Sequence, residues 1–182
     1  MSKRLLTLMV AMAAAGLASH ALADPLTSDQ YKAEKDRITA EYKADKESCK
    51  PLSGNAKDIC MAQAEGKEKV AKADAEAAYK STNKARMDAQ LARAEAAYKI
   101  DKEKCDDQSG NDKAVCKKDA KANYVHAKSD AKAGKEIRDI RKDAANDKRD
   151  ADYAAAAQRC DSLAGDAKSQ CKASAKAQFG KS

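Results

Sequence analysis

Apolar side chains recur along the chain at helical spacing, although few of them are large. In the first long segment they follow one another at steps of seven, four and seven residues: Tyr31, Ile38, Tyr42 and Cys49. Such steps place them on one face of a helix. Thr27 or Ser28 can cap this helix, with Gln30 three residues after Thr27. Continued along the chain, the pattern predicts six helices, over about residues 28–49, 56–80, 84–105, 112–133, 137–160 and 166–179.

Two features are expected to separate helices within this series. Ser81, Thr82 and Asn83 form a run of capping residues and predict a break. Gly134 is expected to interrupt the helical run that follows the fourth cysteine. Gly66 also lies within a predicted helix, where glycine costs about 1 kcal/mol relative to alanine without ending the helix.

Six cysteines divide the chain into three similar units. Each unit has two cysteines with ten residues between them, and equivalent cysteines recur after 56 and then 55 positions: Cys49 and Cys60, Cys105 and Cys116, Cys160 and Cys171. A tyrosine stands seven residues before the first cysteine and a glycine five residues after it: Tyr42, Tyr98 and Tyr153; Gly54, Gly110 and Gly165. This agreement indicates an internal repeat, which we divide into residues 24–80, 81–134 and 135–182.

The two cysteines of each unit lie symmetrically about a predicted reversal of the chain. The glycine is expected to take the left-handed conformation that ends a helix, and the residue after it to cap the next one: Asn55, Asn111 and Asp166. The thiols then face each other across an antiparallel helix pair and form a disulfide, which we call a staple. Each staple contributes about 2 to 3 kcal/mol. The three tyrosines are expected to pack beside the staples.

Metal binding or redox chemistry is the alternative use of these cysteines. Zinc sites favour closely spaced Cys or mixed Cys and His ligands, and a thioredoxin-like site needs Cys-x-x-Cys. Neither pattern occurs, and His126 is the only histidine after residue 23. The spacing therefore favours structural disulfides, with no metal and no cofactor, over a metal-sequestering thiol protein.

The composition makes a thick core impossible. Residues 24–182 contain 35 Ala but only 13 Leu, Ile, Val and Phe. Alanine, lysine and glutamate form helices readily, whereas a methyl group buries little apolar area. We therefore expect an all-α protein in which three disulfide-stapled helical hairpins form an elongated array rather than a compact bundle.

The first 23 residues have the pattern of an export signal. Lys3 and Arg4 precede an uncharged apolar stretch, residues 5–17, and a small-x-small cleavage site follows at Ala21 to Ala23. The apolar stretch is shorter than the about 20 residues that span a bilayer. We expect a bacterial signal peptide, a periplasmic or secreted product, and no membrane span after processing.

Charge and motifs exclude several classes of function. The net charge is +7, but lysine and arginine alternate with aspartate and glutamate along the chain. Alternating signs are typical of solvated helix faces, so nucleic-acid binding is not expected, whereas weak attraction to an anionic envelope polymer is. No catalytic motif occurs, so the sequence predicts a protein that is not an enzyme.

The hexapeptide Ala-Glu-Ala-Ala-Tyr-Lys occurs twice, at residues 75–80 and 94–99, within stretches rich in Ala, Lys, Asp and Glu. These stretches resemble the helical middle segment of TolA-like cell-envelope biogenesis proteins. The resemblance implies an envelope location and a rod-like helical body. We expect neither a globular C-terminal domain nor a retained anchor like those of TolA, so the resemblance does not extend to its energy-coupling role.

Two classes of function follow. The first is a non-enzymatic helical structural or interaction protein of the envelope, whose partner is an envelope protein, an anionic envelope polymer or a second copy of the chain. The second is a periplasmic chaperone or holdase that exposes apolar stripes bearing the tyrosines. Metal sequestration by reduced cysteines is a third, less favoured alternative.

Overall fold

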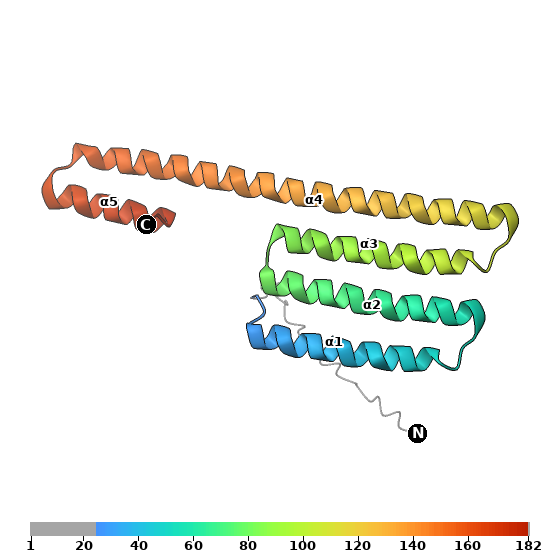
Figure 1. Cartoon of the computed structure of the whole chain (residues 1–182). Coiled ribbons are helices and arrows are strands. Elements are labelled where there is room, and N and C mark those ends of the chain that lie inside the picture. Colours follow the sequence, from blue (N-terminus) through green and yellow to red (C-terminus); the bar gives the residue numbers. More distant parts are fainter. Residues whose placement is uncertain (1–24, 182) are drawn as a thin grey trace, which may run out of the picture.

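The structure, a computed structural model, describes residues 25–181 and is built from helices joined by short turns (Figure 1). The helices are α1 (Ser28–Cys49), α2 (Gly54–Lys80), α3 (Asn83–Cys105), α4 (Gly110–Arg159), the short 3-10 helix η1 (Cys160–Ser162) and α5 (Gly165–Phe179). No strand occurs in this part of the chain, which confirms the all-α class. The expected signal peptide, residues 1–23, lies outside the described residues.

The helices form a layer one helix thick. Along residues 25–181, α1 packs only against α2, α2 against α1 and α3, and α3 against α2 and α4. Neighbouring helices run antiparallel, and α5 folds back on the far end of α4 (Figure 1). Because each of these helices packs only on its neighbours in sequence, the described part of the chain has no central core and is elongated.

The predicted interruption at Gly134 is wrong. α4 continues through this residue and is 50 residues long in all, about 75 Å at 1.5 Å per residue. Residues 25–181 therefore contain five α-helices, not six, and the expected boundary between residues 134 and 135 falls inside α4. A single glycine costs only about 1 kcal/mol in a helix, and no capping residue follows Gly134 to start a new one. As a result, α4 is both the second arm of the second hairpin and the first arm of the third.

The break predicted between α2 and α3 is confirmed. Ser81 takes a left-handed conformation, with φ of 49°, and ends α2. Thr82 then caps α3, because its side-chain oxygen accepts a hydrogen bond from the backbone N–H of Ala85. At the start of α1, Thr27 and Gln30 form the expected capping box.

Alanine fills the contacts between the helices. Apart from Ile38 and the first cysteine of each staple, all buried apolar residues are alanines: Ala62, Ala64, Ala75, Ala85, Ala89, Ala92, Ala94, Ala96, Ala120, Ala131 and Ala175. α3 buries alanines on two opposite sides, since it lies between α2 and α4. Small side chains let neighbouring helix backbones approach closely, which compensates in part for the small area that each alanine buries.

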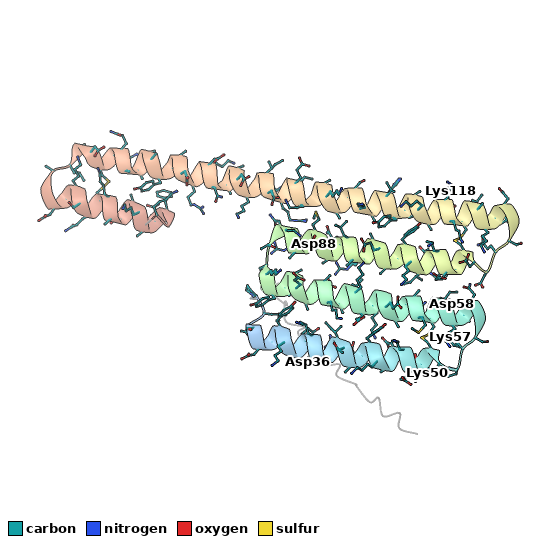
Figure 2. All side chains as sticks on the ribbon, viewed as in Figure 1. Asp36, Lys50, Lys57, Asp58, Asp88 and Lys118 are labelled. Carbon is teal, nitrogen blue, oxygen red and sulfur yellow. A yellow bond between two sulfur atoms is a disulfide. The ribbon has the colours of Figure 1, made fainter. Side chains whose placement is uncertain are left out.

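Polar and charged side chains project from every helix of the layer (Figure 2). Several ion pairs connect α2 to its neighbours: Lys67 with Asp45 of α1, and Lys69, Asp74 and Glu65 with Glu95, Arg93 and Lys99 of α3. These side chains are exposed, so each pair contributes little by itself. The pairs do favour this order of helices over a slipped or exchanged one.

Gly66 marks the closest approach of α2 and α3. A Cβ atom built there would lie 3.1 Å from the Cβ of Ala96, which is buried. We expect Gly66→Leu to separate the two helices and to lower the free energy of unfolding by about 2 kcal/mol, despite its better helix propensity. Gly134→Ala is the control, because only the mobile end of Arg138 lies near that position. It should stabilise by about 1 kcal/mol in the same denaturation experiment. Equal effects of both changes would contradict this packing.

Candidate functional site

The six cysteines form three disulfides, each within one unit, as the spacing predicts. They join Cys49 to Cys60, Cys105 to Cys116 and Cys160 to Cys171, with Cα–Cα distances of 5.6, 5.6 and 5.7 Å. The first cysteine of each pair is at most 1% exposed. Because no cysteine is left free, no thiolate is available in this state to bind a metal or attack a substrate.

The stapled turns share one backbone geometry. The carbonyl oxygen of the first cysteine accepts a hydrogen bond from the N–H three residues later, in the pairs Cys49 with Leu52, Cys105 with Gln108 and Cys160 with Leu163. The turn glycines follow with positive φ: Gly54 at 55°, Gly110 at 54° and Gly165 at 56°. Each glycine is left-handed as expected, but it opens the returning helix instead of ending the first, because the first helix stops at or near its cysteine.

The expected caps Asn55, Asn111 and Asp166 are not the helix caps. The N-cap residues are Ser53, Ser109 and Ala164, and their side chains make no capping hydrogen bond. The predicted caps lie one residue inside the helices. The positive φ of the glycine sets the entry to the helix without a side-chain acceptor. The predicted caps are thereby free for other contacts.

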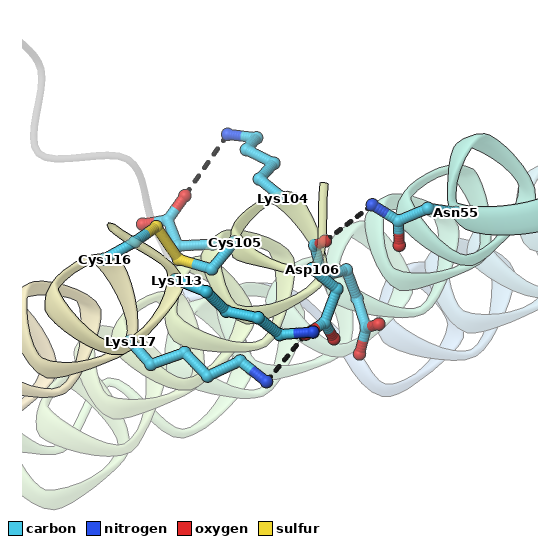
Figure 3. The surroundings of a disulfide bond; sticks show 9 residues. Asn55, Lys104, Cys105, Asp106, Lys113, Cys116 and Lys117 are labelled. Atoms are coloured by element: carbon cyan, nitrogen blue, oxygen red, sulfur yellow. Dashed lines mark hydrogen bonds and ion pairs between the residues drawn. A yellow bond between two sulfur atoms is a disulfide. The ribbon is translucent and has the colours of Figure 1, made fainter. Parts of the chain in front are cut away.

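Asn55 connects the first turn to the second (Figure 3). Its side-chain N–H groups donate to the carbonyl oxygen of Glu103, at 2.8 Å, and to the Asp107 carboxylate, at 2.6 Å. The two stapled turns therefore lie side by side at one end of the layer. The third turn lies at the opposite end of α4 (Figure 1).

A carboxylate beside the staple closes the second and third turns. Asp106 forms ion pairs with Lys113 and Lys117 across the turn, at 2.9 and 2.6 Å (Figure 3). The third turn repeats this arrangement with three residues in the same register: Asp161, Lys168 and Lys172. In the first turn the position after the cysteine is Lys50, which pairs with Glu47 in its own helix. The first turn instead has the Asn55 contact.

We expect acid to weaken the second turn through Asp106. Hydrogen bonds from Lys117 and Lys113 lower the pKa of this carboxyl from 3.8 to about 2. Because the pKa is lower in the folded state, the ion pairs stabilise the turn above about pH 4 and are lost as the pH falls toward 2. Thermal unfolding at pH 5 and pH 2.5 should therefore show a larger loss for the unchanged protein than for Asp106→Asn.

Asp58→Asn is the control for this acid effect, since Asp58 is an exposed carboxylate at the start of α2 (Figure 2). It should lose as much stability in acid as the unchanged protein does. If Asp106→Asn loses just as much, the turn carboxylate has no part in the acid response.

Aromatic pairs lie two helical turns from the second and third staples. Tyr98 stacks on Tyr124 with ring centroids 5.2 Å apart, and Tyr153 meets the edge of Phe179 at 6.4 Å. The partners were not expected from the sequence. Both stand eight residues after the second cysteine, a spacing that could have identified them. Each pair adds a second layer of contact below its disulfide.

The first unit departs from this arrangement. Position 68, eight residues after Cys60, is a glutamate, and Tyr42 lines a small recess with Glu68 instead of meeting an aromatic ring. The aromatic pair of this hairpin lies at its open end, where Tyr31 stacks on Tyr79 with centroids 4.6 Å apart. Most aromatic side chains are therefore engaged with one another within the hairpins.

Neither the surface nor the comparisons point to a known activity. Along residues 25–181, no group of three or more His, Cys, Asp or Glu side chains is placed to hold a metal ion. No helix of this part of the chain has an apolar stretch long enough to cross a bilayer. The chain matches no family model, and it is similar to no curated protein and to no solved structure. Three disulfides nevertheless indicate an oxidising, extracellular or periplasmic location.

Proposed function

We propose that the protein is a non-enzymatic, exported structural or interaction protein of the bacterial cell envelope. In this proposal it acts as a helical spacer that carries two stapled modules. One module is the layer formed by α1, α2, α3 and the first half of α4, and the other is the α4–α5 hairpin. The export pattern of residues 1–23 and the three disulfides support the location.

The observation that carries the proposal is the bare stretch of α4, residues 143–149, between the modules. Every residue in it is exposed except Asn146, which is half-buried. A helix without neighbours has no packing role, so its length sets the distance between the modules. Alternating charges keep such a helix solvated.

The holdase alternative has less support. It requires exposed stripes bearing Tyr31, Tyr42, Tyr98 and Tyr153 to bind unfolded clients, whereas all four are half-buried and all but Tyr42 are paired with another ring. Among residues 25–181, the large exposed apolar residues include one pair at helical spacing, Ile137 and Ile140 on α4, and are otherwise scattered along the sequence.

Cell fractionation combined with thiol labelling tests the proposal. We expect the processed chain in the periplasm of a bacterial host, with all six cysteines resistant to alkylation until a reductant is added. The purified oxidised protein should not prevent aggregation of an unfolded client at equimolar ratio. A cytoplasmic chain with reactive thiols would contradict the location, and suppression of aggregation would favour the holdase.

A further inference from the structure

Positive charge gathers at one place on the molecule, which we call the basic groove. It lies where the connection between α2 and α3, residues 81–83, meets the middle of α4, and its volume is about 630 Å³. Six cationic side chains line it: Lys84, Arg86, Lys135, Arg138, Arg141 and Lys142. Asp139 is the one carboxylate among the described lining residues, so the groove carries a net charge of +5. This equals the whole excess of positive charge over residues 24–182, so the rest of that segment is neutral overall.

Three of these cations have an ion-pair or hydrogen-bond partner, and for the other three the structure gives no ion pair. Lys135 pairs with Asp139, Lys84 pairs with Asp88 at 2.6 Å, and Arg86 donates to the Asn83 side chain. For the other three the structure describes no ion pair: Arg138, Arg141 and Lys142. Asp139 is already occupied, because Asn83 also donates to it at 2.8 Å. Cations therefore outnumber carboxylates in the groove.

Arg138 shows this imbalance most directly. Its Nε and Nη2 atoms are shielded from water and have no hydrogen-bond partner. The guanidinium lies against Gly134, where a Cβ atom would come within 3.3 Å of Nη1. A desolvated guanidinium without acceptors is unfavourable, and a small reorientation toward an anion in the groove would satisfy it. The flat fork of arginine suits the paired oxygens of a phosphate group.

Two helix ends also lie at the groove. α3 begins at Asn83 on its wall and brings the positive end of its dipole there, while α2 ends beside it at Lys80 and brings a negative end. The Asn83 to Asp139 hydrogen bond fixes this helix start against α4. Helix starts favour anions, and here one adjoins three unpaired cations.

We propose that the basic groove binds a phosphate-bearing group with two or more negative charges, held by Arg138, Arg141 and Lys142. This deepens and rests on the proposed envelope function, since it names the chemistry of the partner. A single carboxylate would neutralise little of the net +5, whereas a pyrophosphate or phosphorylated headgroup matches it better. A nucleic-acid strand fits less well, because the neutral remainder of the surface offers no track for a long backbone.

Titration calorimetry of the purified, oxidised protein with inorganic pyrophosphate at low ionic strength tests the proposal. We expect saturable binding that weakens at least tenfold in Arg138→Gln/Arg141→Gln. The matched control is Lys148→Gln/Arg149→Gln, which removes the same charge from the bare stretch and should change the affinity less than twofold. Circular dichroism of both variants should show unchanged helix content, so a loss of binding is not a loss of fold.

Two further probes distinguish the sources of the phosphate. The first is co-sedimentation with vesicles of phosphatidylglycerol and phosphatidylcholine. The phosphate belongs to a lipid headgroup if the groove variant, Arg138→Gln/Arg141→Gln, no longer binds the vesicles and the control variant still does. Pyrophosphate binding without vesicle binding identifies a soluble phosphate compound. Equal weakening in both variants, no saturable binding, or tighter binding of single-stranded DNA that the groove variant retains would each overturn the proposal. These assays use purified protein and do not depend on export. Phosphate binding can therefore be absent although the protein is periplasmic, and it can be present although the protein is not.

Discussion

Replacing Cys160 and Cys171 by serine will release α5 from the end of α4. α5 has only 15 residues and contacts only α4 and η1 within residues 25–181. Besides the staple it has the Tyr153–Phe179 pair, buried Ala175 and ion pairs from Lys168 and Lys172 to Asp161, and Lys181 just after it pairs with Asp150. The staple contributes about 3 kcal/mol, and isolated helices of this length are marginal in water. Hydrogen exchange should therefore show that the amides of α5 lose their protection.

The matched control removes the second staple with Cys105→Ser and Cys116→Ser. α3 and α4 also pack on each other away from the staple and share the Tyr98–Tyr124 pair, so this variant should unfold at lower temperature but keep both helices protected. If α5 remains as protected without its staple as with it, packing alone holds the third hairpin, and the disulfide is not its main support.

Ala145→Pro will uncouple the two modules. Proline removes a backbone hydrogen bond, clashes with the preceding turn and costs about 3 kcal/mol in a helix interior. Ala145 is exposed in the bare stretch, so no packing exists there to hold the helix straight. We expect small-angle scattering to show a shorter and broader distribution of distances, while the thermal unfolding of the layer stays unchanged.

Ala145→Ser is the control for this change, because it keeps the backbone hydrogen bond and should leave the scattering curve unchanged. A strong loss of stability of the layer in Ala145→Pro would contradict the independence of the two modules. It would show that the bare stretch supports the layer through contacts or cooperativity.

The sequence predicts the hairpins well because their signals are local and repeated. The Cys-x10-Cys spacing, the glycine five residues after the first cysteine and the cap at Thr82 each act within one or two turns. The disulfide pairing, the all-α class and the break before α3 are accordingly confirmed.

Such local signals do not predict that α4 is continuous or which residues cap the helices. At Gly134 the cost of glycine is small and competes with good helix formers on both sides, so the outcome depends on the absence of a cap. At the turns, the position of the first helix end decides whether glycine closes one helix or opens the next. One-residue shifts of this kind redirect Asn55 from a cap to a contact with another turn.

The basic groove depends on packing between distant segments. Lys84 and Arg86 are about 50 residues from Lys135 and Arg138 in the sequence, and each stands among acidic neighbours. The alternation of basic and acidic residues along the chain predicts a surface of evenly mixed charge. The antiparallel pairing of α3 and α4 places these cations together, which no local pattern reveals.

Small-angle X-ray scattering of the oxidised, unmodified protein tests the central claim, an open array of stapled hairpins on one continuous α4. We predict a maximum dimension of about 75 Å or slightly more, set by the 50 residues of α4. A folded globule of this chain length would be about 40 Å across, with a radius of gyration of about 15 Å. Such compact values from the fully oxidised, helical protein would contradict the single-layer arrangement.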